Sequence, residues 1–240
     1  FLIFNYKIGL AGNNSERNTF DDRVGQPKIK VDTLSNHFKF NTVNNSGNIS
    51  YRYAVKKVNF NIGTGIGSAK YSLFDYATNA SRAVNFINFI PSATFNFTPK
   101  QQKKFILSYV GNTQNPSLLQ IQPIIDNTDP LNITVGNANL RQSFTNKFSF
   151  NYTTFKIIKN KYVQLSGSFS NTNDAIATSS NIDAFGKSVN QYVNVDGNYN
   201  YGSGFYYDFE LFKGINFGMN TGINGGRYNN IVNGIKNTND

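Results

Sequence analysis

The nonapeptide FTNKFSFNY, residues 144–152, places apolar and polar side chains in alternation. Apolar residues fall on the even positions Phe144, Phe148, Phe150 and Tyr152, whereas the odd positions hold Thr, Lys, Ser and Asn. Successive side chains of a β-strand point to opposite faces of its sheet. The segment is therefore predicted to be a strand with one apolar face and one hydrated face.

The same period of two recurs along most of the chain. It argues against the disordered structure that an Asn-rich composition would otherwise suggest. The runs predict about nine strands of about ten residues each, with no convincing helix, so the fold class is all-β. Their apolar members are Leu2, Phe4, Tyr6, Ile8 and Leu10; Ile49, Tyr51, Tyr53 and Val55; Val58, Phe60, Ile62 and Ile66; Ala93, Phe95 and Phe97; Phe105, Leu107 and Tyr109; Val163, Leu165 and Phe169; Val193, Val195, Tyr199, Tyr201, Phe205, Tyr207, Phe209 and Leu211; and Ile215, Phe217, Met219 and Ile223.

The predicted connections alternate in length. Short turns are predicted near 56–57, 99–104, 157–161 and 212–214, and long loops at about 11–46, 77–86, 112–141 and 175–189. An antiparallel meander with short periplasmic turns and long extracellular loops is typical of outer-membrane β-barrels. A soluble β-sandwich is the alternative, but it has little reason to separate its loops by length.

The residue types on the apolar face favour the membrane. A sandwich core is usually rich in Val, Ile and Leu, whereas this face is dominated by Phe and Tyr, which suit a lipid-facing band with aromatic girdles. A girdle is predicted near the short turns, formed by Tyr53, Phe97, Phe105, Phe155 and Tyr162.

Composition narrows the function classes. The 240 residues include no Cys and one His, which argues against disulfide scaffolds, thiolate zinc sites and His-based triads. The mean hydropathy is −0.41 and no apolar stretch is long enough for a transmembrane helix. The net charge of +10 suggests a nucleic acid at first. Nine of the 23 basic residues instead cluster at the short turns, where they keep the turns in water: Lys56, Lys57, Lys100, Lys103, Lys104, Lys156, Lys159, Lys161 and Lys213.

About nine strands make an odd number, and bacterial single-chain barrels have even numbers. An open sheet edge in lipid would leave backbone groups unpaired. Residues 1–240 are therefore expected to be a single partial barrel domain, whose remaining strands lie outside this chain. Phe1 begins in what reads as the middle of a strand, which fits an internal slice.

One long loop carries a recognisable motif. Tyr109 ends a strand, Pro-Ser-Leu-Leu-Gln-Ile-Gln-Pro follows at 116–123, and the chain re-enters the sheet after Gly136. This loop resembles that of TonB-dependent receptor-like outer-membrane proteins of Bacteroidota, as does the later strand at 192–199. Ala138 and Arg141-Gln142 depart from the family pattern. The matching residues, to which we assign a structural role, are Pro116, Ser117, Leu118, Gln120, Pro123, Asp129, Pro130, Gly136, Asn137 and Leu140.

The prolines are expected to pre-order this loop, and Gly136-Asn137 to provide a turn with access to positive φ. The resemblance implies a 22-stranded barrel in the bacterial outer membrane, an N-terminal plug, a TonB-type energy-coupling complex and uptake of a substrate. The candidate lumen-facing residues are Asn59, Asn61, Asn96, Asn151, Gln164, Asn216 and Asn220.

Other functions have weaker support. A surface adhesin or structural barrel is the main alternative. A barrel enzyme would need partners for His37, which lies near Asp32 and Ser35 without a second catalytic signature. A calcium site would need regularly spaced oxygen ligands, which are missing around Asp21-Asp22 and around Asp126 and Asp129. A phosphate-binding loop would need a following helix, but Gly63–Gly67 lies inside a predicted strand. No enzyme activity, cofactor or metal is predicted.

Overall fold

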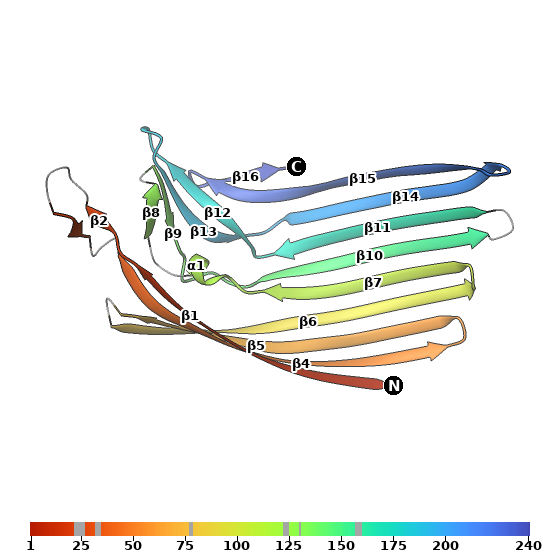
Figure 1. Ribbon diagram of the computed structural model, residues 1–240, viewed down its shortest axis with the longest axis horizontal. Helices are drawn as coiled ribbons and strands as arrows, with labels where there is room; N and C mark the ends of the chain where they lie inside the picture. The colour runs from red at the N-terminus through yellow and green to blue at the C-terminus, as the bar shows by residue number, and fades with distance from the viewer. Residues whose placement is uncertain (22–26, 32–34, 77–78, 122–124, 130, 157–159) are drawn as a thin grey trace.

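A computed structural model describes residues 1–21, 27–31, 35–76, 79–121, 125–129, 131–156 and 160–240. Within these residues, nine long antiparallel strands form one continuous sheet, here called the wall (Figure 1). Each strand pairs with the next one along the wall, as predicted for a meander. The wall strands are β1 (Leu2–Arg17), β4 (Asn36–Val55), β5 (Val58–Asp75), β6 (Ala80–Lys100), β7 (Lys103–Gln114), β10 (Ser143–Lys156), β11 (Lys161–Asn173), β14 (Asn198–Phe212) and β15 (Ile215–Val232).

The smaller elements gather at one end of the wall, here called the long-connection end; the opposite end is the short-turn end. β2 (Phe20–Asp21) pairs with β3 (Ile29–Lys30) between β1 and β4. The 115–142 connection holds the short helix α1 (Leu118–Ile121) and strands β8 (Ile125–Asp129) and β9 (Asn132–Val135). β12 (Ala175–Ile182) and β13 (Ser188–Val195) form a hairpin, and β16 (Ile235–Asn239) pairs with β15.

The strand register confirms that the apolar sets share one face. Directly paired residues lie on the same side of a sheet, and one row runs across eight wall strands. Its members are Tyr53, Phe60, Phe95, Leu107, Phe150, Gly167, Ser203 and Ile223. We call this side the apolar face and the other side the polar face.

Several connection and strand predictions were wrong. The 77–86 loop does not exist as such, because β6 begins at Ala80. The 175–189 loop is mostly the β12–β13 hairpin. The predicted continuous strand from Val193 breaks after Val195, because Gly197 adopts a φ of +94° before β14 begins.

The predicted girdle was also partly wrong. Phe155 pairs with Tyr162, but the register places both on the polar face, since their neighbours Thr154 and Val163 occupy the apolar face. The polar–apolar alternation shifts by one residue next to the short turn there. Tyr53, Phe97 and Phe105 lie on the apolar face as predicted, and the Phe97 and Phe105 ring centroids are 6.1 Å apart.

Strands β4, β5 and β6 extend well beyond the predicted ten residues, and their polarity inverts along the way. On β5 the apolar face carries Phe60, Ile62 and Ile66, but further on it carries Ser68, Lys70 and Ser72. The polar face becomes apolar over the same stretch. Toward the long-connection end it carries Phe38, Phe40, Ala69, Tyr71, Leu73, Val84 and Phe86.

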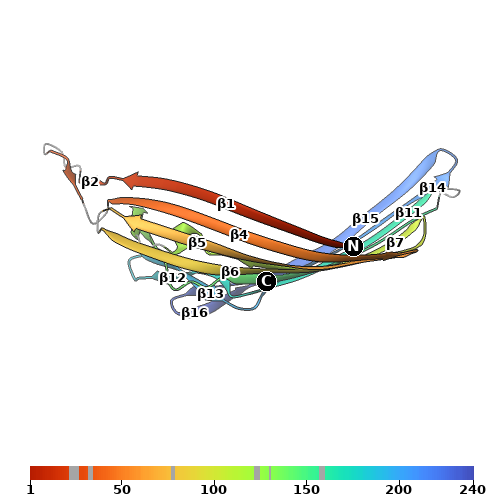
Figure 2. The ribbon, with the colours of Figure 1, turned by 90° about the horizontal axis from the view of Figure 1, so that it is seen from below.

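We call this inverted segment of β4, β5 and β6 the outer wall, and it contributes three of the buried hydrophobic residues. Phe38, Ala69 and Phe86 are 6%, 1% and 6% exposed, whereas many large side chains of the apolar face toward the short-turn end are exposed. Figure 2 shows the twisted sheet edge-on, with β1 along one side and the β14–β15 turn at the short-turn end. Among the described residues, no helix is long and apolar enough to span a membrane.

Candidate functional site

The polar face brings the seven candidate lumen residues onto one surface. Asn59 lies directly opposite Asn96, and Asn151 lies opposite Ser166. Gln164 and Asn220 flank Tyr206 on the next strands. The two remaining candidates also have paired neighbours on this face: Asn61 is paired with Arg52, and Asn216 is paired with Glu210.

A groove of about 490 Å³ lies in the middle of this face, over β7, β10, β11 and β14. Lys147 is exposed on its rim, and its ammonium group has no ion pair or hydrogen bond with any residue that the structure describes. Glycines form part of the floor, because a β-carbon on Gly204 would lie 3.0 Å from Ser166 Oγ. The polar side chains of the lining are those of Lys147, Ser149, Asn151, Ser166 and Ser168.

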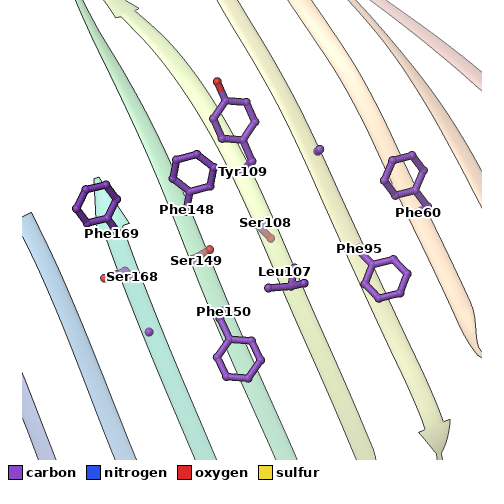
Figure 3. A pocket seen from close by; sticks show the side chains of 12 residues that line it. Phe60, Phe95, Leu107, Ser108, Tyr109, Phe148, Ser149, Phe150, Ser168 and Phe169 are labelled. Carbon is purple, nitrogen blue, oxygen red and sulfur yellow. The ribbon is translucent and has the colours of Figure 1, made fainter. Parts of the chain in front are cut away.

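The apolar face carries its own groove, of about 460 Å³, over β5 to β11 (Figure 3). Aromatic side chains form its walls: Phe95 and Phe150 lie in one register row, and Tyr109 and Phe148 in the next. Gly167, which is paired with Phe150, has no side chain, and this gap in the row opens the groove. Its character is almost entirely hydrocarbon.

The family-motif loop folds onto the polar face of the outer wall. Leu118 and Ile121 of α1 line a small cavity together with Phe40, Tyr71 and Leu73 of the outer wall. The Phe40 and Tyr71 rings meet edge to face with centroids 5.4 Å apart. Burial of this apolar cluster explains why polarity inverts there, since the outer wall turns its apolar side toward the loop.

The motif residues support the loop from within. Pro116 is fully buried, and Leu140 is 6% exposed. The Gln120 side chain accepts a hydrogen bond from the Ser117 backbone at 2.8 Å, and the Asn137 backbone donates to the Gln120 carbonyl at 2.6 Å. These contacts give the motif a structural basis. Pro123 and Pro130 lie outside the described residues.

One detail of the motif differs from the expectation. Neither Gly136 nor Asn137 adopts a positive φ; Gly136 is instead buried. Asp129 accepts hydrogen bonds from the Asn132 side chain at 2.7 Å and the Leu131 backbone at 2.9 Å. These two bonds, the side-chain one first, lower the pKa of the Asp129 carboxyl from its usual value.

The 115–142 and 174–197 connections are joined to one another. β9 and β13 pair in parallel, from Asn132 opposite Ser188 to Val135 opposite Gln191. Asn194 bridges the start of β10 to the start of β12: its amide donates to the Arg141 carbonyl at 3.0 Å and to the Asp174 carbonyl at 2.8 Å. An Arg141–Asp174 ion pair lies beside this bridge. The two long connections therefore form one hydrogen-bonded unit.

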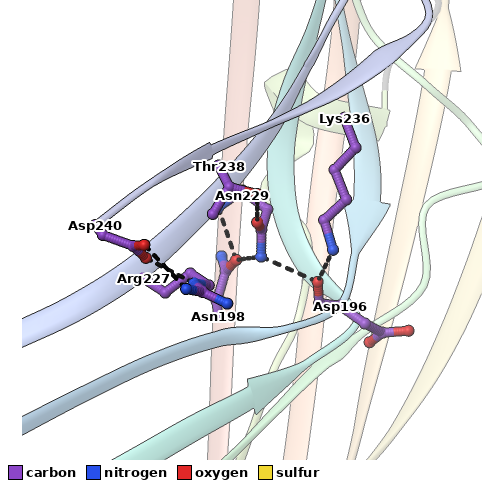
Figure 4. A network of polar contacts seen from close by, with 7 residues as sticks. All are labelled: Asp196, Asn198, Arg227, Asn229, Lys236, Thr238 and Asp240. Atoms are coloured by element: carbon purple, nitrogen blue, oxygen red, sulfur yellow. Dashed lines mark hydrogen bonds and ion pairs between the residues drawn. The ribbon is translucent and has the colours of Figure 1, made fainter.

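A second polar network attaches this unit to the last strands (Figure 4). Asn229 on β15 is 4% exposed and sits at its centre. Its amide donates to the Asp196 carbonyl at 3.1 Å and the Asn198 side chain at 2.9 Å, and its oxygen accepts from Thr238 at 2.8 Å. Lys236 also donates to the Asp196 carbonyl, at 2.8 Å.

The structure brings no catalytic set together around His37. Its ring stacks on Tyr76 with centroids 4.3 Å apart. The Ser35 hydroxyl donates to the Val31 carbonyl at 2.8 Å, and Asp32 lies outside the described residues. Over the part of the chain that the structure describes, no three His, Cys, Asp or Glu side chains are placed to hold a metal ion. Asp22 is not described, and Gly63–Gly67 lies within β5 as predicted.

Sequence reasoning missed three parts of this site. These are the inverted outer wall, the packing of α1 upon it, and the Asn194 bridge. The first had a signal in the sequence, because Tyr71, Leu73, Val84 and Phe86 alternate in the opposite phase to the apolar residues that precede or follow them.

Comparisons with known proteins agree with this architecture. The model of a family described as "Outer membrane protein beta-barrel family" matches residues 2–240. The copper transporter OprC has a similar structure, with a TM-score of 0.61 and 12% identity over 92% of this chain. The siderophore receptor PirA from Pseudomonas aeruginosa gives a TM-score of 0.50 and 11% identity over 95%.

Identities this low show a shared fold and nothing more specific. The chain spans 36% of the length of OprC and 52% of that of PirA. A search of the curated proteins found no match.

Proposed function

Because the chain belongs to the outer membrane protein beta-barrel family, we propose that it forms part of the barrel of a TonB-dependent receptor that imports a substrate. It is a bacterial outer-membrane protein. The observation that carries the proposal is the register, which separates one aromatic face from one amide- and hydroxyl-rich face over the wall between the short turns and the outer wall.

In this proposal the apolar face meets lipid and the polar face lines the lumen. Strands of outer-membrane barrels alternate between lipid and lumen in this way. The short-turn end then faces the periplasm, and the 115–142 and 174–197 connections lie outside the cell. A plug and the remaining strands, supplied by other parts of the protein, complete the barrel.

Residue chemistry suits passage of a polar solute along the lumen. Asn, Ser and Thr side chains offer both donors and acceptors, so a solute can exchange one partner for the next. Two structural neighbours are named for different cargoes, copper and siderophores, so the shared fold does not select a cargo. We assign no catalytic role to the chain.

Uptake measurements test the proposal. Cells with and without the full-length protein are grown on single sources of carbon and metal, and the comparison is repeated with the TonB-type complex inactivated. A nutrient whose use requires both the protein and the complex supports import. Loss of attachment to surfaces, with every nutrient still used, would instead support the adhesin.

A further inference from the structure

Lysines crowd the short-turn end of the wall. Within the described residues, eight of them lie in or next to its turns: Lys56, Lys57, Lys100, Lys103, Lys104, Lys156, Lys161 and Lys213. None of these eight forms a salt bridge with another described residue. The nearby acidic residue Glu210 is engaged elsewhere, because its carboxylate accepts the Gly214 backbone N–H at 2.9 Å.

Four of these lysines are paired with each other. Lys100 lies directly opposite Lys103, and Lys156 lies directly opposite Lys161. Like charges directly across a strand pair are destabilising. The arrangement therefore costs free energy unless an anion outside the chain neutralises it.

The register also shows on which face these pairs lie. Lys103 is directly paired with Thr154, and Thr154 is directly paired with Val163. Val163 lies on the apolar face, so Lys103 lies there too. Lys161 faces Phe209, and its ammonium lies 5.7 Å from the centroid of that ring. The four lysines therefore form a basic rim on the lipid side, level with Phe209 and immediately beyond Phe97 and Phe105.

We propose that this basic rim binds the anionic headgroups of phospholipids in the periplasmic leaflet. Aromatic residues at the end of an apolar band mark the level of the lipid headgroups, and the rim lies at that level or immediately beyond it. Lysine stems can lie along apolar surface while their ammonium groups reach the interface. Basic clusters at a membrane boundary gain free energy from anionic lipid. The proposal rests on the family and on the orientation of the wall, and it holds whether or not the protein transports a substrate.

Lipid titration of the purified full-length protein tests the proposal. Delipidated protein in neutral detergent is titrated with phosphatidylglycerol or phosphatidylcholine, and bound lipid is counted by native mass spectrometry. Phosphatidylglycerol is expected to bind more tightly, and the difference is expected to shrink at high salt because screening shortens the range of the attraction.

Substitutions locate the site. Changing Lys100, Lys103, Lys156 and Lys161 to Gln is expected to lower the phosphatidylglycerol affinity by about fivefold per lysine and to leave phosphatidylcholine binding unchanged. The four corresponding Arg substitutions retain the charge and are expected to retain the affinity. A matched control removes the same net charge elsewhere, by changing Lys7, Lys39, Lys70 and Lys187 to Gln.

Three outcomes would overturn the proposal. Phosphatidylglycerol could bind the Gln variant as tightly as the unchanged protein. The control variant could lose as much affinity as the rim variant, which would indicate an effect of net charge alone. Finally, a soluble polyglutamate peptide could bind the rim more tightly than the lipid does, which would point to an acidic protein partner.

Discussion

Gly111 of β7 lies against Pro91 of β6 so closely that a β-carbon built on Gly111 would be 2.7 Å from Pro91 Cγ. The same β-carbon would be 2.7 Å from Phe144 Cζ on β10. Side chains of the two strands that flank β7 thus approach Gly111 on the apolar face, toward the long-connection end of the wall. Only glycine fits there without displacing a ring.

Gly111→Ala is therefore expected to destabilise the protein by about 1–3 kcal/mol, the usual cost of overpacking. The measurement is thermal or denaturant unfolding of the full-length protein in detergent. Gly47→Ala is the control, because a β-carbon on Gly47 meets nothing within 4 Å. Equal stability of the two variants would contradict the close approach.

Ile121→Ala is expected to cost about 2–5 kcal/mol, because it opens a cavity between α1 and the outer wall. Ile121 is 8% exposed, whereas Leu131 in the same connection is 59% exposed. Leu131→Ala should therefore leave unfolding unchanged. Proteolysis of folded protein in the 115–142 connection should become faster in the first variant only. If both variants are cleaved alike, α1 does not anchor this connection.

Asn194→Ala is expected to loosen the two long connections, because it removes three hydrogen bonds, to Arg141 N, Arg141 O and Asp174 O. Each such bond contributes about 0.5–1.5 kcal/mol. Arg141→Gln should have a smaller effect, since its ion pair with Asp174 is largely exposed and exposed pairs contribute about 0–1 kcal/mol. Amide hydrogen exchange in β12 and β13 provides the measurement. The exposed residue Gln191 on β13 supplies a control as Gln191→Ala, which should exchange like the unchanged protein.

Cysteine labelling distinguishes the membrane band from the outer wall. The chain contains no cysteine, so single substitutions report cleanly. Ser72→Cys and Ile62→Cys lie on the same side of β5, but only the first is beyond the polarity inversion. A membrane-impermeant maleimide added to intact cells is expected to label Ser72→Cys and to spare Ile62→Cys. Labelling of both positions would place the membrane boundary elsewhere.

The nine long strands of the wall and their two faces were predictable because alternation is local. Phe148, Phe150 and Tyr152 need no knowledge of their neighbours to indicate an apolar side, and the register then joins them to Leu107 and Leu165. The short turns were predictable for the same reason. Lys56, with a φ of 47°, is a local reversal between two clear runs.

The outer part of the fold was not predictable from such local patterns. The Asn- and Ser-rich hairpin of β12 and β13 forms because it pairs with β9 and β15, and these lie far away in the sequence. The packing of α1 likewise depends on Phe40 and Tyr71. Long-range pairing determines both, so composition alone indicated loops.

The polarity inversion on β4, β5 and β6 has one further consequence. Because a strand presents its side chains with a period of two, the chain can exchange the environments of its two sides without any change of backbone. One side of an uninterrupted strand therefore meets two environments. Over residues 58–66 it suits a hydrocarbon layer of the length that about nine tilted residues cross, and over residues 68–72 it carries Ser68, Lys70 and Ser72 and suits water. Chimeras joined at Ile66 and Gly67 could exchange the extracellular portion between related barrels while keeping every hydrogen bond of the ladder.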